Sequence, residues 1–200
     1  TPGVAIDETA PLNPLSLYAE HKVAIEEYLL TLGNVPSTIT ILRIATAFGV
    51  SPRMRLDLTV SHFTADAIYD NRIEIFDADT WRPYCHVEDV SQAINLALSK
   101  RNGSPNAEVF NVGSNQNNFT KRMLSDVIRK FVPTVQIVDQ GVGSDARDYR
   151  VNFDRIRANL NFEATRTIED HVPLLASSMR YGLLGINRAS RSEMGNYSLG

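Results

Sequence analysis

"STITILRIATAFG", residues 37–49, is a run of apolar and β-branched residues that directly follows a helical pattern. Its apolar residues occupy both alternating faces, as expected of a strand buried on both sides in a parallel sheet. The preceding segment, "SLYAEHKVAIEEYLLTLG", has apolar residues mostly at helical spacing and ends at Gly33, so we expect a helix over 16–32. A helix followed by a buried strand is typical of an α/β fold.

The alternation of helices and strands continues along the chain. The pattern predicts strands in "RIEIFD", "RPYCHV", "EVFNVGS" and "TVQIVDQ". It predicts helices over 57–70, after "RPYCHV", and beginning at the caps Thr120, Asp154 and Thr167. Pro173 lies inside the last helix, so we expect a kink or a later start there. Residues 186–200 have no periodicity and are expected to form a loose tail.

Composition excludes several classes of protein. The 200 residues carry a formal net charge of −3, which argues against a nucleic-acid binder. Sixteen of the 20 basic residues are Arg, a bias that fits phosphorylated ligands and equally a GC-rich genome. One cysteine leaves no disulfide framework, so a cytoplasmic location is expected. No apolar run approaches the length of a membrane span, so no membrane partner is expected.

Tyr18 and Lys22 are four residues apart in the predicted helix over 16–32. Residues at this spacing lie on one face of a helix, so the Lys22 ammonium can approach the phenol oxygen. A nearby cation favours the phenolate and lowers the pKa of a tyrosine, as a general base acting near neutral pH requires. Taken alone, the spacing favours a simpler interpretation, a surface pair beside a helix N-terminus.

Five segments occur together in a recognisable order: "PLSLYAEHK", "LRIATAFGVSPRMRLD", "WRPYCHVEDVSQAINLAL", "EVFNVGS" and "DARDYRVNFDRI". Their order and spacing resemble the extended short-chain dehydrogenase/reductases, and more narrowly the NAD-dependent epimerase/dehydratase family acting on nucleotide-activated sugars. The resemblance covers about residues 5–185. It implies that Tyr18 takes a proton from a sugar hydroxyl, and that Lys22 holds the nicotinamide ribose and lowers the pKa of Tyr18.

The resemblance also implies residues that bind the nucleotide sugar. Arg82 corresponds to an Arg near the nucleotide or diphosphate, and Arg147, with Arg150 behind it, to the Arg of a diphosphate-binding loop. Two guanidinium groups on one pyrophosphate would each supply charge-assisted paired hydrogen bonds. Arg53 is a further candidate for substrate binding. The alternative role of these arginines is a surface salt bridge to a nearby Asp.

At one position the chain departs from the family pattern. Many relatives have an Asn that contacts the diphosphate where this chain has Ser61 followed by His62. Either side chain can hydrogen-bond a phosphate, so we expect an altered substrate site that includes Ser61. His86 and Asp89 are expected to orient the turn and cap the following helix rather than to take part in chemistry.

The glycine-rich motif of the family, G-x-x-G-x-x-G, does not occur in the sequence. Its glycines let the backbone approach a pyrophosphate at a helix N-terminus. The nearest cluster, "GVGSD" at 141–145, precedes an Arg-rich loop and is interpreted as a turn. The cofactor, NAD or NADP, therefore lacks its main binding loop here, and we expect the chain to be part of a longer enzyme and inactive alone. The resemblance implies a homodimer for the full-length protein.

The implied fold is the C-terminal part of a Rossmann-like doubly wound parallel sheet, with a smaller α/β substrate-binding lobe. Residues 1–46 and 83–116 are expected to belong to the NAD-binding domain, and residues 47–82 and 117–185 to the substrate-binding lobe. In such a fragment, the helix that bears Tyr18 and the strand after it would expose apolar surface and a sheet edge.

Alternatives to an epimerase or dehydratase stay open. The same Tyr and Lys would serve a keto-sugar or other carbonyl reductase that runs the chemistry in the opposite direction. A non-catalytic binding or assembly module that has lost cofactor binding is a different class, because fold does not fix function. The presence of Tyr18 and Lys22 favours the enzyme, whereas the absence of the glycine motif favours the module. Nothing in the sequence chooses between epimerase and dehydratase.

Overall fold

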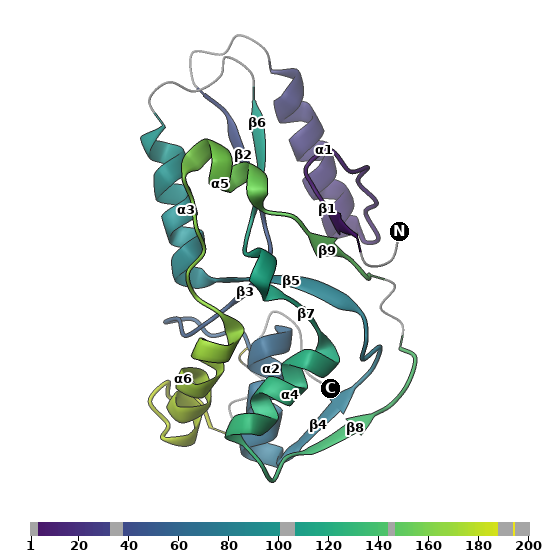
Figure 1. Cartoon of the computed structure of the whole chain (residues 1–200), viewed down its shortest axis with the longest axis vertical. Coiled ribbons are helices and arrows are strands. Elements are labelled where there is room, and N and C mark those ends of the chain that lie inside the picture. Colours follow the sequence, from purple (N-terminus) through teal and green to yellow (C-terminus); the bar gives the residue numbers. More distant parts are fainter. Residues whose placement is uncertain (1–3, 33–37, 101–106, 144–146, 188–193, 195–200) are drawn as a thin grey trace.

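The computed structural model describes residues 4–32, 38–100, 107–143, 147–187 and 194. The helices are α1 (Leu17–Thr31), α2 (Thr59–Ala65), α3 (Val87–Ser99), α4 (Lys121–Phe131), α5 (Asp154–Leu160) and α6 (Ile168–Arg180). The strands are β1 (Ala5–Ile6), β2 (Thr40–Ile44), β3 (Thr46–Phe48), β4 (Arg72–Ile75), β5 (Trp81–His86), β6 (Glu108–Val112), β7 (Asn118–Thr120), β8 (Gln136–Asp139) and β9 (Arg150–Val151). The molecule is elongated, with β3, β5 and β7 between an upper and a lower part (Figure 1).

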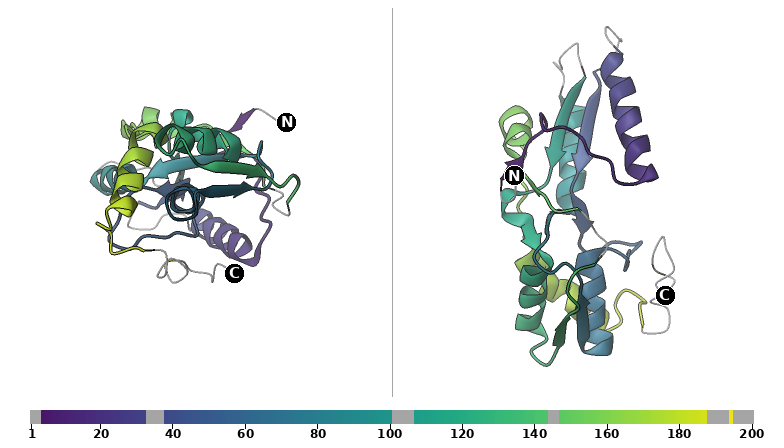
Figure 2. Two further views of the ribbon diagram at one scale, coloured as in Figure 1. Left: turned by 90° about the horizontal axis from the view of Figure 1, so that it is seen from below. Right: turned by 90° about the vertical axis from the view of Figure 1, so that its right-hand side faces the viewer.

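The upper part contains α1, α3, α5 and the parallel pair of β2 and β6. The register of this pair runs from Thr40 opposite Glu108 to Ile44 opposite Val112. Helices α1 and α5 lie on opposite faces of the two strands, as the right-hand view of Figure 2 shows. A core of buried side chains from β5, β6, α3 and α5 includes Cys85, whose thiol has its pKa raised to about 12 by burial. The parallel pairing between these helices confirms the predicted α/β class.

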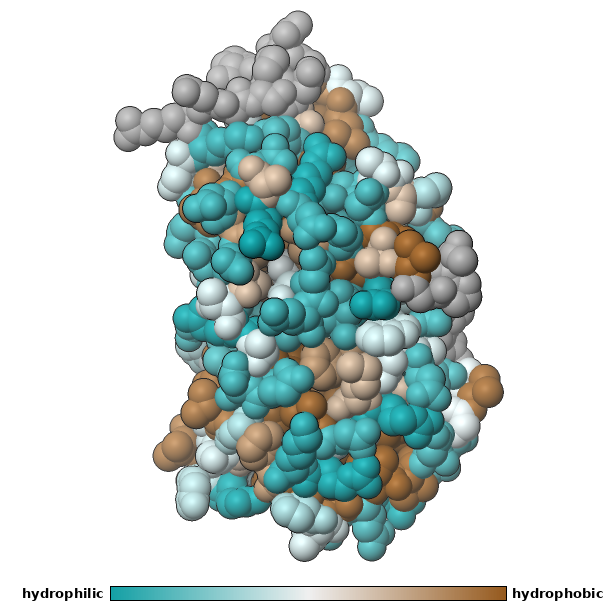
Figure 3. Space-filling view, in the orientation of Figure 1, coloured by the Kyte–Doolittle hydropathy of each residue, from teal (hydrophilic) through white to brown (hydrophobic). Residues whose placement is uncertain are grey.

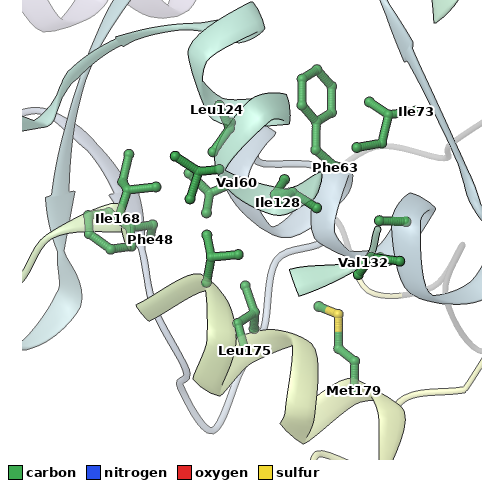
Figure 4. Close-up of a cluster of buried hydrophobic side chains, with 14 of the residues drawn as sticks. Phe48, Val60, Phe63, Ile73, Leu124, Ile128, Val132, Ile168, Leu175 and Met179 are labelled. Carbon is green, nitrogen blue, oxygen red and sulfur yellow. The ribbon is translucent and has the colours of Figure 1, made fainter. Parts of the chain in front are cut away.

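The lower part is built around α2, α4 and α6. Their apolar side chains meet in one cluster, with Phe63, Leu124 and Leu175 among its members (Figure 4). Strand β4 alternates exposed and buried residues and pairs in parallel with β8. The predicted helix over 57–70 is present as α2, which continues into a π-helical turn at Asp66–Asp70.

Strand β5 connects the two parts, because it pairs in parallel with β3 and antiparallel with β7. The predicted buried strand in 37–49 is in fact two strands, of which β2 pairs with β6 and β3 with β5. Ala45 stands between them, and its N–H still donates to the carbonyl of Val112 at 2.9 Å. The chain therefore changes partner immediately after this residue and leads from the upper part into the lower.

The predicted helix caps are confirmed in two of three cases. The hydroxyls of Thr120 and Thr167 accept hydrogen bonds from backbone N–H groups in the first turns of α4 and α6. The predicted cap at Asp154 is wrong, because Asp154 is the first helical residue and accepts from the side chain of Asn115 instead. Helix α6 begins directly after Thr167, so Pro173 does not delay its start.

The core of the upper part includes residues that the sequence boundaries assign to the substrate-binding lobe. Residues 151–162 contribute five buried side chains to it, although the boundaries drawn from sequence place them with the substrate-binding lobe. The division of the chain into lobes at those boundaries stays a prediction. Of the expected loose tail over 186–200, Ile186 is buried, whereas most of the rest lies outside the described residues.

Helix α1 and strand β2 expose apolar surface, as expected. Leu17, Ile25 and Tyr28 of the helix are more than half exposed, and Ile44 of the strand is 47% exposed. Among the described strands, β2 pairs only with β6, so it is not buried on both sides as its sequence predicts. Elsewhere hydrophilic residues cover most of the face seen in Figure 3, and hydrophobic residues form separate groups. No helix in the described ranges is long and apolar enough to span a membrane.

Candidate active site

Helix α1 places Tyr18 and Lys22 beside each other. Ser16 caps the helix by accepting a hydrogen bond from the N–H of Ala19 at 3.3 Å. The Lys22 ammonium nitrogen lies 5.4 Å from the centroid of the Tyr18 ring. Tyr18 is 71% exposed, so a ligand can reach its hydroxyl. The predicted shared helix face is therefore confirmed, and the two side chains form an accessible phenol and ammonium pair.

The pair faces a cavity of about 630 Å³ between α1 and strand β2. Ile25 and Leu29 of the helix, together with Ile41, Leu42, Ile44 and Ala45 in and after β2, form its apolar sides. Glu26 of α1 and Arg43 and Thr46 of the β2 region also line it, and the other lining residues come from the N-terminal segment, β5, β6 and the β9 region: Ile6, Leu12, Pro83, Asn111, Tyr149, Val151 and Phe153. A largely apolar cavity that contains a few polar groups is the usual setting of a small-molecule site.

Tyr149 connects this cavity to two of the predicted substrate-binding arginines. The Arg82 guanidinium carbon lies 5.6 Å from the centroid of the Tyr149 ring. The guanidinium carbon of Arg150 lies 4.6 Å from the centroid of the Trp81 ring. The Tyr149 N–H donates to the carbonyl of Trp81 at 3.2 Å, which joins the two segments. Arg82 and Arg150 therefore lie on neighbouring segments, and each guanidinium lies over an aromatic ring of the other segment.

The other predicted substrate-binding residues lie elsewhere. Arg147 is exposed on the segment before Tyr149, and Arg53 is exposed on the loop before α2. Ser61 is only 3% exposed within α2, so its hydroxyl is largely shielded from solvent. None of these three residues lines the cavity that contains Tyr18. Arg82, which is only 7% exposed, and Arg150 do not line it either, and Tyr149 is the residue that joins Arg82 to the cavity. Sequence reasoning did not single out Tyr149, although its place between two candidate arginines was a usable signal.

His86 and Asp89 have structural roles in the described contacts. Nδ1 of His86 accepts a hydrogen bond from the N–H of Glu88 at 3.2 Å, which confirms the predicted cap of α3. Asp89 is fully buried and accepts from the backbone N–H and the guanidinium of Arg166, at 3.1 and 2.8 Å. Asp89 therefore holds the segment before α6 against α3, and it does not cap the helix.

His86 also packs against His171 of α6, with ring centroids 3.9 Å apart. Burial and the neighbouring His171 lower the pKa of His86 to about 4, and burial likewise lowers the pKa of His171. Gly49, at φ 114°, lies against the same ring, and a Cβ there would stand 2.2 Å from Nε2 of His86. A glycine is therefore required at this position by both backbone conformation and space.

Glu26 and Arg43 form an ion pair that sequence reasoning missed. Nε and Nη2 of Arg43 donate to the two carboxylate oxygens of Glu26, at 3.0 and 2.5 Å. The hydrogen bonds to Glu26 raise the pKa of Arg43. The signal in the sequence was an Arg inside an otherwise apolar strand, because a charge in such a place requires a partner. Both residues line the cavity with Tyr18 and Lys22.

A second cavity, of about 650 Å³, lies in the lower part between α2, β4 and the start of α4. It contains His62, the residue beside Ser61, together with Arg72 and Lys121. Four carboxylates line it as well, from Asp57, Asp66, Asp70 and Glu74. Such an excess of negative charge disfavours a phosphate, so this cavity does not support a phosphate contact of His62.

The described residues contain no group of three or more His, Cys, Asp and Glu side chains placed to hold a metal ion. The glycines of "GVGSD" follow strand β8, and Gly141 has a positive φ of 79°. The N–H of Gly141 donates to Asp139 at 2.9 Å, and the N–H of Gly143 donates to Asp77 at 2.7 Å. These carboxylates occupy the N–H groups of Gly141 and Gly143, which disfavours a phosphate-binding loop here, whereas residues 144 and 145 of the interpreted turn lie outside the described residues.

Comparison with known proteins gives one family match. The model of the NAD-dependent epimerase/dehydratase family matches residues 1–113. MoeE5, solved in complex with UDP-glucose and NAD, superposes with a TM-score of 0.76 at 22% identity, covering 90% of this chain and 60% of that one. RMD from Pseudomonas aeruginosa, complexed with NADPH, superposes with a TM-score of 0.76 at 21% identity, covering 90% and 61%. A UDP-glucose 4-epimerase from Thermotoga maritima, solved with UDP-glucose, gives 0.72 at 25% identity, covering 89% and 58%.

These superpositions confirm the Rossmann-like α/β fold expected from the sequence. The chain spans about 60% of the length of the first of these relatives.

Proposed function

The chain belongs to the NAD-dependent epimerase/dehydratase family, and we propose that it supplies the catalytic base and the substrate-binding arginines of a nucleotide-sugar epimerase or dehydratase. One observation carries the proposal: Tyr18, Lys22 and Tyr149 share a single cavity, and Tyr149 carries Arg82 on its ring. The proposed proton acceptor thus shares a cavity with a tyrosine that contacts a candidate phosphate-binding cation, which suits a substrate with a sugar and a diphosphate.

Tyr18 is the general base of the proposed reaction. Its exposed phenolate oxygen accepts the proton of a sugar hydroxyl and becomes the neutral phenol, and the ammonium of Lys22, on the same helix face, stabilises the phenolate before that transfer. The two residues also fit the nicotinamide end of a dinucleotide, because both line the open cavity, where they would hold the ribose. Bound NAD or NADP supplies the hydride transfer of this family's chemistry.

The arginines bind the diphosphate of the substrate in this proposal. Arg82 and Arg150 lie on adjoining segments with their guanidinium groups over aromatic rings, which restricts where each fork points. Arg147 is exposed on the segment that leads to Tyr149 and is the third candidate. The ring of Tyr149 contacts Arg82 and lines the cavity that contains the base, where it can contact the sugar.

The substitution Tyr18→Phe tests the assignment of the base. In the complete enzyme, assayed with NAD and UDP-glucose, we expect turnover to fall by about 10³-fold, the usual scale for a lost general base. Binding of UDP-glucose, measured by calorimetry, should stay within about twofold, because the arginines are unchanged. Tyr28→Phe is the matched control, since Tyr28 is an exposed tyrosine of the same helix that does not line the cavity. Full activity of Tyr18→Phe would show that the base is another residue.

A second experiment uses the 200-residue chain alone. We expect no binding of NAD at micromolar concentration, because the sequence has no G-x-x-G-x-x-G motif to hold the pyrophosphate. Isothermal titration of the chain with NAD measures this directly. Micromolar affinity would mean that the chain holds the cofactor without that motif.

A further inference from the structure

One face of α1 lines the cavity but lies apart from the sheet. Its residues are Tyr18, Lys22, Ile25, Glu26 and Leu29, which recur at helical spacing. The cavity of about 630 Å³ lies between this face and β2, so close apolar packing does not hold the helix in place there. The orientation of Tyr18 and Lys22 therefore depends on whatever contact joins α1 to β2 across the cavity.

The ion pair of Glu26 and Arg43 is that contact. Glu26 is the buried residue of α1, at 8% exposure, and Arg43 is the fourth of the five residues of β2. Within the described residues of α1, no other side chain makes a hydrogen bond or ion pair to another element. Arg43 also donates to the carbonyl of Glu8 at 3.2 Å, and the Glu8 carboxylate accepts from the N–H of Asn111 in β6 at 2.7 Å. The pair is thus held from both strands.

The geometry of the pair fixes rotation as well as distance. Two parallel N–H to carboxylate bonds restrict the direction of both groups, which a single hydrogen bond or a point charge does not. Glu26 lies four residues after Lys22 and eight after Tyr18, on the same face. A rotation of α1 about its axis would therefore move all three side chains together.

We propose that Glu26 and Arg43 are positioning residues, which set the rotation of α1 over β2 and thereby place Tyr18 and Lys22 in the cavity. This inference rests on the proposed function of Tyr18 and Lys22. Neither Glu26 nor Arg43 exchanges a proton with the substrate in this scheme. Their effect on the reaction comes through the position of the base, and a displacement of about 1 Å at a reacting group can cost about 100-fold in rate.

The substitutions Glu26→Gln and Arg43→Lys test the proposal. Glu26→Gln keeps the shape and removes the charge, whereas Arg43→Lys keeps the charge and removes the fork. Glu108→Gln is the matched control: Glu108 pairs with Lys100 at 2.6 Å, with similar burial, and ties the end of α3 to β6 away from the cavity. The native protein and the three variants are compared in two ways. Amide hydrogen exchange of the segment 17–31 is measured in the 200-residue chain, and steady-state kinetics with UDP-glucose and NAD are measured in the complete enzyme.

We expect exchange in 17–31 to speed up by about tenfold in Glu26→Gln and to stay within about twofold in Glu108→Gln. In the complete enzyme, Glu26→Gln should lower kcat by about 10- to 100-fold with KM for UDP-glucose nearly constant. Arg43→Lys should give an intermediate kcat, since it keeps the charge but loses the paired hydrogen-bond geometry. A structural role alone would not produce this split between kcat and KM.

Two results would overturn the proposal. Unchanged exchange in Glu26→Gln would mean that α1 is held by other contacts, and faster exchange with normal kcat would mean that the rotation of α1 does not matter for the reaction. The proposed function is tested apart from this, because full activity of Tyr18→Phe would refute the base whatever the exchange of α1. The exchange measurement decides the structural half of the inference even if the base is another residue.

Discussion

Helices α1 and α6 begin in the same way but are held in the molecule differently. Ser16 and Thr167 cap them, each by accepting from a backbone N–H three residues on. Helix α6 then buries Ile168, Val172, Leu175, Ala176 and Met179 in the core of the lower part. Helix α1 buries only Glu26, and its side-chain link to the sheet is an ion pair.

The difference shows that a helix signal and a burial signal are separate properties of a sequence. Caps and helix-forming residues define where both helices start, whereas burial depends on what packs against them. The lower part is held by apolar contacts among many buried side chains. The region of α1 is held by directed polar bonds, which fix an orientation across a cavity. A helix held in the second way suits a catalytic pair that must stay accessible.

The largest expected difference between α6 and α1 is in the free energy of unfolding lost when one leucine of each helix is truncated. Leu175→Ala in α6 should lower the free energy of unfolding by about 3 kcal/mol, because Leu175 is 1% exposed in the core. Leu30→Ala in α1 should change it by about 0.5 kcal/mol or less, since Leu30 is 47% exposed. Urea unfolding followed by circular dichroism measures both. Equal losses would mean that α1 is packed as firmly as α6.

A smaller loss of stability is expected at acid pH, because two histidines pack together where the upper and lower parts meet. His86 lies at the start of α3 and His171 in α6, and Glu88, Asp89, Asp170 and Arg166 are the charged groups around them. The folded pKa of His86, about 4, lies below its ordinary value of 6.5, so the unfolded chain binds a proton more readily. Stability from this group is therefore complete above pH 6.5 and falls as the pH drops toward 4, by on the order of 2 kcal/mol.

Urea unfolding at several pH values between 4.5 and 7 measures this dependence. His21→Gln is the control, because His21 is exposed on α1 and should leave the pH profile unchanged. His171→Gln should flatten the profile, since it removes the neighbour whose charge opposes protonation of His86. The same slope in His171→Gln and the native chain would assign the acid sensitivity to other groups.

The smallest effect concerns the two caps. Thr167→Ala should lower the free energy of unfolding by about 1 kcal/mol, as is usual for a lost N-cap in a packed helix. Ser16→Ala removes an equivalent hydrogen bond, but we expect it mainly to raise amide exchange in 17–31, because α1 can open without the core of the lower part. A global loss of stability in Ser16→Ala as large as that in Thr167→Ala would contradict the weak coupling of α1.

Features that depend on near neighbours in the chain could be predicted from the sequence. Tyr18 and Lys22 share a helix face because helical spacing alone puts them there. The caps at Thr120 and Thr167 follow from residue type and the helix after them. The cap expected at Asp154 failed because a distant residue, Asn115, uses its carboxylate. Local rules thus identified one wall of the candidate site and most helix starts.

Features that join distant segments could not be predicted in the same way. The contact of Arg82 with Tyr149 spans 67 positions of sequence and depends on how β9 and the loop before it run past β5. The pairing of Glu26 with Arg43 needed knowledge of which strand lies under α1. The exposure of Leu17 and Tyr28 was expected only through the family resemblance, because an apolar pattern shows which face of a helix is hydrophobic but not whether anything covers it.

Cys85 gives the molecule a practical property. The chain has one cysteine, which is fully buried in β5, and burial raises the pKa of its thiol to about 12. Alkylating and spin-labelling reagents react with the thiolate, so the folded protein should be inert to them near neutral pH. A cysteine introduced at an exposed position such as Leu17→Cys would then be the sole labelled site, without removal of the native residue. Helix α1 can therefore carry a fluorescent or paramagnetic reporter in an otherwise unaltered chain.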